Sequence, residues 1–93
     1  MSASFEIIEK EIIHSLSFPK LEVLNSKEEI QQRFSDLTRA LSLGNLEHSK
    51  IKIYFEDNLS KKVVETTVWG VTDQRIILKQ GNSIPINRIY KSA

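Results

Sequence analysis

The sequence predicts an α+β domain in which two N-terminal helices are followed by a four-stranded, antiparallel and strongly bent sheet. Two observations carry this prediction. Apolar residues recur at helical spacing up to about residue 45, and from Lys50 onward they alternate with polar residues. Short turns separate the strand-like segments, which favours antiparallel pairing of consecutive strands. The 93 residues are expected to form a single domain, with a helical part at 1–45 and a sheet or barrel part at 50–92.

The clearest helix signal begins at Ser26 and ends near Leu43. Ser26 and Glu29 form an S-x-x-E capping box, in which each side chain satisfies a free backbone N–H at the helix start. Gly44 follows the last apolar turn and is expected to be a left-handed C-cap. The apolar residues of this stretch should face the core and cover one end or face of the sheet: Ile30, Phe34, Leu37 and Leu41, with Ala40 beside them.

The segment from residue 5 to residue 16 is open to two interpretations. Phe5, Ile8, Ile12 and Leu16 would form one helical stripe, whereas the β-branched residues in FEIIEKEII also suit a strand. We favour a helix that ends before Pro19, because the residue preceding a proline avoids helical dihedral angles. Residues 17–25 then connect the two helices.

Four strands are expected in the second half of the chain. Ile51, Ile53 and Phe55 alternate with polar residues, as in a half-buried strand. Further strands are predicted at residues 63–72, 75–79 and 84–90, with turns at 56–61, 73–74 and 80–83. Pro85 cannot donate to a strand ladder and should lie at a sheet edge or at the start of its strand.

The strand at residues 63–72 is long for so small a sheet, and its glycine predicts a bend. Gly70 interrupts the row of side chains and permits a bulge. Before the bend, Val64, Thr66 and Val68 should share one face. Beyond it, Trp69 or Val71 would turn toward the core. Four antiparallel strands bent in this way form a small open barrel.

The segments LTRALSLGN, KIKIYFED, TDQRIILKQ and IPINRIYK, in this order, resemble the Sm-like or SH3-like small barrels, and among them the Hfq-type bacterial Sm-like proteins. The resemblance covers about residues 37–92 and implies a ring-forming, RNA-binding fold. Two positions depart from the Sm-like pattern. Thr67 stands where that family usually has a glycine, and Pro85, Ile86 and Asn87 replace its basic and aromatic RNA motif. More loosely, the sequence also resembles small uncharacterised bacterial proteins.

Composition narrows the classes of function. With no cysteine, the chain has no disulfide and no thiolate metal site, which fits a cytoplasmic protein. The N-terminus is acidic where a signal peptide would be basic, and no apolar run approaches the roughly 20 residues needed to span a bilayer. His14 and His48 lack metal-ligand spacing, and no nucleophile or phosphate-loop motif occurs. We therefore expect a protein that is not an enzyme and that uses no cofactor, metal or membrane.

The charge distribution points toward a binding function. Residues 1–49 carry five Lys or Arg and eight Asp or Glu, whereas residues 50–93 carry eight and four. The first hypothesis is a non-catalytic interaction or assembly module that forms homo-oligomers or binds a protein partner. The alternative is binding of RNA or single-stranded DNA, in which cations contact phosphates and aromatic rings stack on bases. The candidate binding residues for either hypothesis are Lys52, Tyr54, Lys61, Lys62, Trp69, Arg75, Lys79, Arg88 and Tyr90.

Overall fold

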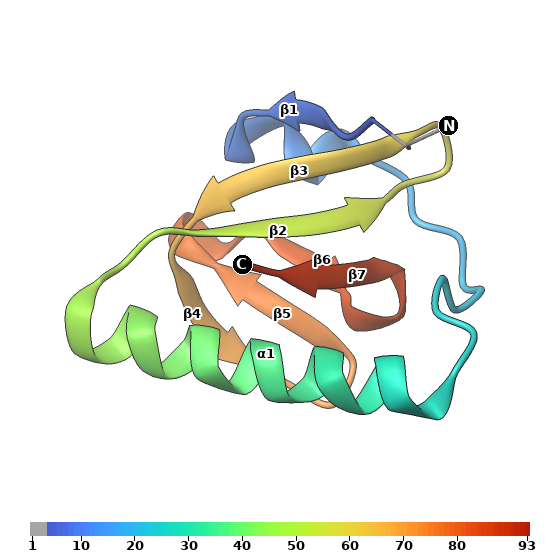
Figure 1. The fold of residues 1–93 in the computed structure, drawn as a ribbon. Coiled ribbons are helices and arrows are strands. Elements are labelled where there is room, and N and C mark those ends of the chain that lie inside the picture. Colours follow the sequence, from blue (N-terminus) through green and yellow to red (C-terminus); the bar gives the residue numbers. More distant parts are fainter. Residues whose placement is uncertain (1–3) are drawn as a thin grey trace.

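The computed structural model describes residues 4–93, which form one long helix and seven short strands in two sheets (Figure 1). The α+β class is therefore confirmed. The first sheet has the strand order β1-β3-β2-β7, and the second has the order β4-β5-β6. The elements in chain order are β1 (Glu6–Ile8), the 3-10 helix η1 (Lys10–Ser15), α1 (Lys27–Glu47), β2 (Ile51–Glu56), β3 (Lys61–Thr66), β4 (Val68–Val71), β5 (Arg75–Leu78), η2 (Lys79–Gly81), β6 (Ser83–Pro85), η3 (Ile86–Arg88) and β7 (Ile89–Ser92).

The expected single sheet of four strands is wrong, because two of the predicted strands are interrupted. The run at 63–72 breaks at Thr67, where β3 leaves the first sheet and β4 enters the second. The run at 84–90 is interrupted by η3, so that β6 and β7 also lie in different sheets. In residues 4–93 these two sheets do not close into a barrel. Pro85 lies in β6, an edge strand, as predicted.

The N-terminal segment is a strand and a 3-10 helix rather than the favoured α-helix. β1 pairs in parallel with β3, with Ile7 opposite Val63 and Ile8 opposite Val64. This parallel pair departs from the all-antiparallel arrangement that the turns predict, whereas β2–β3, β4–β5 and β5–β6 follow it. Ile8 and Ile13 are buried in the core, which explains why this segment folds back onto the sheets.

The helix α1 begins as the sequence predicts but ends later and presents a different face. The Ser26 hydroxyl accepts the N–H of Glu29 at 3.1 Å, as predicted. The Glu29 carboxylate accepts from the Ser26 hydroxyl at 3.3 Å, whereas the capping box predicted a bond from the Ser26 N–H. The C-cap is His48 in the left-handed conformation, and Gly44, predicted to be the C-cap, lies inside the helix. The residues that α1 buries are Arg33, Leu37, Ala40 and Gly44.

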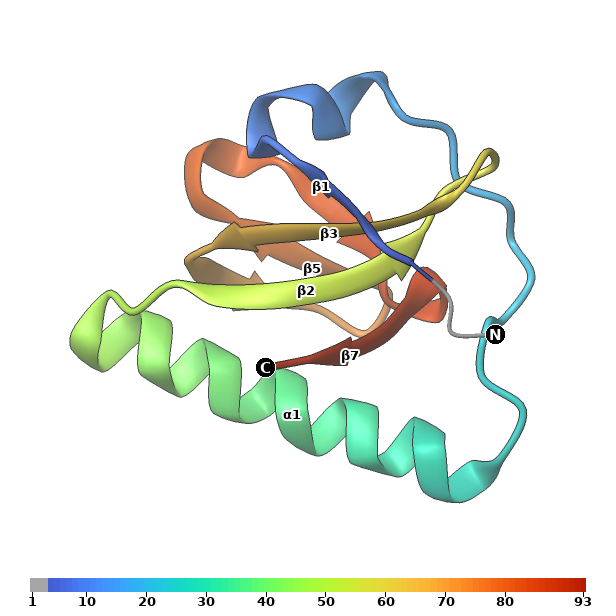
Figure 2. The same cartoon turned by 45° about the horizontal axis from the view of Figure 1, so that its top comes forward.

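The predicted core stripe of α1 is only partly correct. Leu37 is buried and Leu41 packs at the margin of the core. Ile30 and Phe34 lie on the surface, and the side chain of Phe34 is 65% exposed. The helix runs beside β4 and β7 (Figures 1 and 2). At Gly44 it lies directly against the backbone of β4. A Cβ atom built on Gly44 would lie 2.2 Å from the Val68 carbonyl oxygen, so no larger residue allows this approach.

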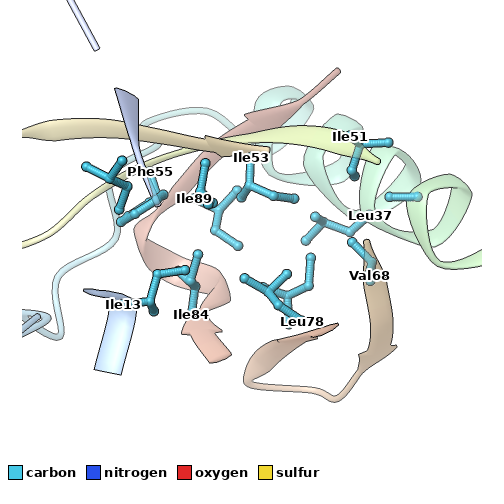
Figure 3. Close-up of a cluster of buried hydrophobic side chains, with 13 residues drawn as sticks. Ile13, Leu37, Ile51, Ile53, Phe55, Val68, Leu78, Ile84 and Ile89 are labelled. Atoms are coloured by element: carbon cyan, nitrogen blue, oxygen red, sulfur yellow. The ribbon is translucent and has the colours of Figure 1, made fainter. Parts of the chain in front are cut away.

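The core lies between the two sheets and is closed by α1 and η1. Ile51, Ile53 and Phe55 of β2 are buried, which confirms the predicted alternation. Val64, Thr66 and Val68 are also buried, as predicted for one face of the bent strand. Figure 3 shows side chains from both sheets meeting those of η1 and α1 around one centre.

The bend predicted at Gly70 lies three residues earlier in the chain. Pairing changes sheets at Thr67, and the register between β4 and β5 shifts between Val68 and Gly70. The irregularity near the glycine is thus present, but it is a bulge within β4 rather than the corner between the sheets. Val71 packs at the margin of the core, while Trp69 is 52% exposed. Of the two residues expected to turn inward, only the valine does so.

Candidate functional site: a groove walled by the 17–25 linker

The described residues form an open groove of about 700 Å³. Three chain segments that are distant in sequence form its walls: the linker before α1, the turn between β4 and β5, and the end of β6 with the start of η3. Arg33 reaches the groove from α1. The lining residues are Phe18, Pro19, Lys20, Glu22, Arg33, Asp73, Gln74, Arg75, Pro85, Ile86 and Asn87.

A buried arginine of α1 fixes the linker wall. The Arg33 side chain is 5% exposed, and its guanidinium donates to both carboxylate oxygens of Glu22 at 2.6 and 2.7 Å. It also donates to the Ile89 carbonyl at 3.0 Å. Burial alone would raise the pKa of Glu22, but the Arg33 donors and the N–H of Leu24 hold that pKa below its usual value. One planar guanidinium therefore joins the linker, the helix and β7.

A second buried arginine holds the same linker from the sheet side. Arg88 of η3 donates to the Leu21 carbonyl at 2.8 Å and to the carbonyl of Glu56 at 3.0 Å. It also lies 3.4 Å from the carbonyl oxygen of Asp57, which accepts from its guanidinium. Arg88 was a candidate ligand residue, but its donors are directed to three backbone carbonyls inside the fold.

Backbone hydrogen bonds complete the attachment of the groove walls to one another. The Val23 N–H donates to the Asn87 carbonyl at 3.0 Å, and the Asn87 side-chain amide donates to the Lys20 carbonyl at 2.5 Å. The Ile86 N–H donates to the Gln74 carbonyl at 2.9 Å, next to the Arg75–Pro85 pair of β5 and β6. The linker, the β4–β5 turn and η3 are thus parts of one hydrogen-bonded frame.

The β4–β5 turn is itself ordered by a threonine. The Thr72 hydroxyl accepts the N–H groups of Gln74 and Arg75 at 3.1 and 2.9 Å. In return, the Thr72 N–H donates to the Arg75 carbonyl at 2.8 Å. These contacts set the positions of the groove-lining Asp73, Gln74 and Arg75 side chains along the rim.

A buried ion pair stabilises the turn between β2 and β3. Asp57 is buried, and its Oδ1 accepts from Lys62 Nζ at 3.0 Å and from the N–H groups of Leu59 and Ser60. Burial would raise the pKa of Asp57, but these three donors together hold it below its usual value. Its Oδ2 is buried without a hydrogen-bond partner among the described residues. Lys62, a candidate ligand residue, is 5% exposed and its ammonium is held inside the fold.

Four of the nine candidate binding residues gather on the outer face of the first sheet: Lys52, Tyr54, Lys61 and Tyr90. Lys91 and Phe5, which were not among the candidates, join them. The Phe5 ring packs edge-on against the rings of Tyr54 and Tyr90, with centroids 5.1 and 5.8 Å apart. We call these six residues the aromatic–lysine face.

The ring faces of the two tyrosines are already in contact with lysines of the same surface. Lys61 Nζ lies 5.4 Å from the Tyr90 ring centroid, and Lys91 Nζ lies 5.0 Å from that of Tyr54. The Tyr90 hydroxyl donates to Glu56. Burial, followed by this carboxylate, raises the pKa of Tyr90 to about 12. The phenol therefore stays protonated and keeps its hydrogen bond across the neutral pH range.

The remaining candidates lie on or after the strands of the second sheet. Trp69 lies on β4, Arg75 begins β5 and Lys79 begins η2. Of these, Arg75 alone lines the groove. The sequence interpretation missed Lys20, Asp73, Gln74 and Asn87, because no local pattern indicates that residues 18–22, 73–75 and 85–87 meet.

Residues 4–93 contain no group of three or more His, Asp or Glu residues placed to hold a metal ion. Over the same residues, no helix has the length and apolar character needed to cross a membrane. No protein-family model, no curated protein and no solved structure matches the chain. The proposals below therefore rest on the geometry of the chain itself.

Proposed function

We propose that this chain is a non-catalytic interaction module whose groove holds an extended segment of a partner protein. The observation that supports the proposal most strongly is the attachment of the linker wall by the two buried arginines, Arg33 and Arg88. A wall that is already ordered loses little conformational entropy when a ligand binds, which favours affinity. Concave sites with apolar surface and a few placed polar groups are typical binding sites.

The chemistry of the lining favours binding over catalysis. A nucleophile or acid–base pair needs partners within hydrogen-bonding reach. Of the two carboxylates in the groove, Glu22 is bound to Arg33, and Asp73 is exposed on the turn. Within the described residues that line the groove, neither carboxylate is hydrogen-bonded to a hydroxyl or an imidazole.

Selection from a phage-displayed library of random short peptides tests this proposal. We expect enriched peptides, and we expect them to shift the NMR amide signals of residues 18–22, 73–75 and 85–87 in the ¹⁵N-labelled chain. Gln74→Trp should abolish binding because it fills the groove at an exposed position. Gln31→Trp makes the same change on the exposed face of α1 and should leave binding intact. Failure to enrich any peptide, or shifts confined to other surfaces, would refute the proposal.

Single-stranded nucleic acid is the second candidate ligand, and the convergence of lysines and tyrosines on the aromatic–lysine face favours it. A base that stacks on Tyr54 or Tyr90 must first displace Lys91 or Lys61 from the ring. Released lysines could then contact phosphates. Fluorescence anisotropy with labelled oligothymidylate and oligouridylate at several salt concentrations decides this point, because phosphate binding must weaken as salt rises. A salt-independent or absent signal rejects it.

A further inference from the structure

The groove has an excess of cationic side chains that are available to a ligand. Glu22 and Arg33 neutralise each other through two short hydrogen bonds, and Arg33 is buried. The charged residues that remain on the lining are Lys20, Arg75 and Asp73, all three exposed. Among the described residues, no ion pair within 4 Å joins any of these three to another charged group. Two cations therefore face the groove against one carboxylate.

Arg75 is held in position for a ligand without being neutralised. Its Nε donates to the Ser83 hydroxyl at 2.9 Å, and its carbonyl accepts the Thr72 N–H at 2.8 Å. A hydroxyl does not cancel the charge of a guanidinium, so the terminal nitrogens keep both charge and donors for an anionic group. A guanidinium oriented in this way is suited to the two oxygens of a carboxylate.

The apolar part of the lining is attached to the protein core. Phe18 packs against the core residue Phe55, with ring centroids 6.0 Å apart, and Ile86 packs at the core margin. Pro19 and Pro85 extend this apolar surface on the two sides of the groove. Because these residues are anchored, an apolar side chain of a ligand would meet a fixed surface rather than a mobile one.

Pro85 also limits how a partner can be held. It ends the edge strand β6, where a pairing segment would need backbone donors, and a proline has none. Recognition by added strand pairing is therefore weakened at this edge. Side-chain contacts, above all those of Lys20 and Arg75, must then supply much of the specificity.

We infer that the segment bound in the groove is acidic, with an Asp or Glu carboxylate between Lys20 and Arg75 and an apolar neighbour against the proline and isoleucine surface. This inference rests on the proposed function and adds the chemical class of the partner. Two cations beside a carboxylate are too few for a nucleic acid backbone, whose binding depends on several phosphate contacts. An acidic peptide needs only one or two charge pairs.

Matched peptides and charge-reversal variants test the inference. Peptides selected on the groove should be enriched in Asp and Glu, and synthetic copies with Gln for Glu and Asn for Asp should bind roughly tenfold more weakly. Lys20→Glu and Arg75→Glu should each weaken binding of the acidic peptide by at least this factor. Lys79→Glu, the same charge change at an exposed position outside the groove lining, should alter affinity by less than about twofold. Asp73→Asn removes the opposing carboxylate and should strengthen binding.

The outcomes separate this inference from the proposed function. If neutral or basic peptides are enriched and shift the signals of the groove residues, the acidic partner is wrong and the interaction module stands. If peptide affinity is unchanged by Lys20→Glu, the carboxylate site is wrong. If no peptide binds and an oligonucleotide shifts the groove signals instead, both proposals fail. Far-UV circular dichroism of each variant confirms that the substitutions leave the fold intact.

Discussion

Replacing Gly44 by alanine is expected to destabilise the protein by about 3 kcal/mol, although alanine is the better helix former. Helix propensity alone would favour alanine by about 1 kcal/mol at an interior helical position. Here the new Cβ would lie 2.2 Å from the Val68 carbonyl oxygen and 3.3 Å from Thr67 Cγ2. Because the oxygen belongs to the backbone of β4, a whole element must move to relieve the contact.

Urea unfolding followed by circular dichroism measures this effect. Asn45→Ala, at the next and exposed position of the same helix, is the matched control and should change the free energy of unfolding by less than about 0.5 kcal/mol. If Gly44→Ala is as stable as the parent or more stable, the helix does not lie directly against the Val68 carbonyl of β4.

Arg33→Met is expected to cost about 2–4 kcal/mol of stability, because it removes three hydrogen bonds while keeping much of the side-chain volume. The Ile89 carbonyl would lose its arginine donor, and Glu22 its bidentate partner. The exposed Arg39 of the same helix supplies the control. Arg39→Met removes an equal charge from the surface and should change stability by less than about 0.5 kcal/mol.

The pH dependence of the Arg33 effect identifies the Glu22 pair as its source. The pKa of Glu22 is lowered in the folded state, so the pair stabilises the fold above the unfolded pKa of 4.5. That contribution is lost as the pH falls and the carboxylate is protonated. The stability difference between the parent and Arg33→Met should therefore be largest above pH 4.5 and should shrink in acid. A difference that is independent of pH would assign the loss to packing and to the bond with the Ile89 carbonyl, and not to the Glu22 pair.

Signals that act within a few residues were readable from the sequence. The Ser26 cap depends on a partner three residues away, and the burial of Ile51, Ile53 and Phe55 follows from simple alternation. Both were predicted correctly. Pro85 was predicted to lie at a sheet edge or at the start of its strand, because its missing N–H excludes it from a central strand. It lies in the edge strand β6.

Features that depend on distant contacts were not readable in this way. α1 buries an arginine and a glycine, Arg33 and Gly44, in preference to the apolar Phe34. The partners that make this favourable, Glu22 and the Val68 carbonyl, come from other parts of the chain. In the same way, β1 is a strand because it pairs in parallel with β3. No short turn joins these two strands, so no local signal predicts their pairing.

The candidate site was the least predictable part. The sequence does not show whether the charge of a basic residue is exposed to solvent or buried inside the fold. Lys62 and Arg88 were expected to bind ligands, but they hold a turn and the linker from inside. No local pattern marks Lys20 or Asn87 as a groove residue, because the groove exists only once three separate segments have been brought together.

Hydrogen exchange at the Val23 amide tests the central claim most directly. The proposals require that the 17–25 linker is a fixed wall, held by Arg33, by Arg88 and by the bond from the Val23 N–H to the Asn87 carbonyl. We predict that this amide exchanges at least on the order of a hundredfold more slowly than the same amide in an unstructured peptide. If this amide exchanges as fast as in an unstructured peptide, the linker is not held in place. The groove would then lack the ordered wall on which the proposed binding depends.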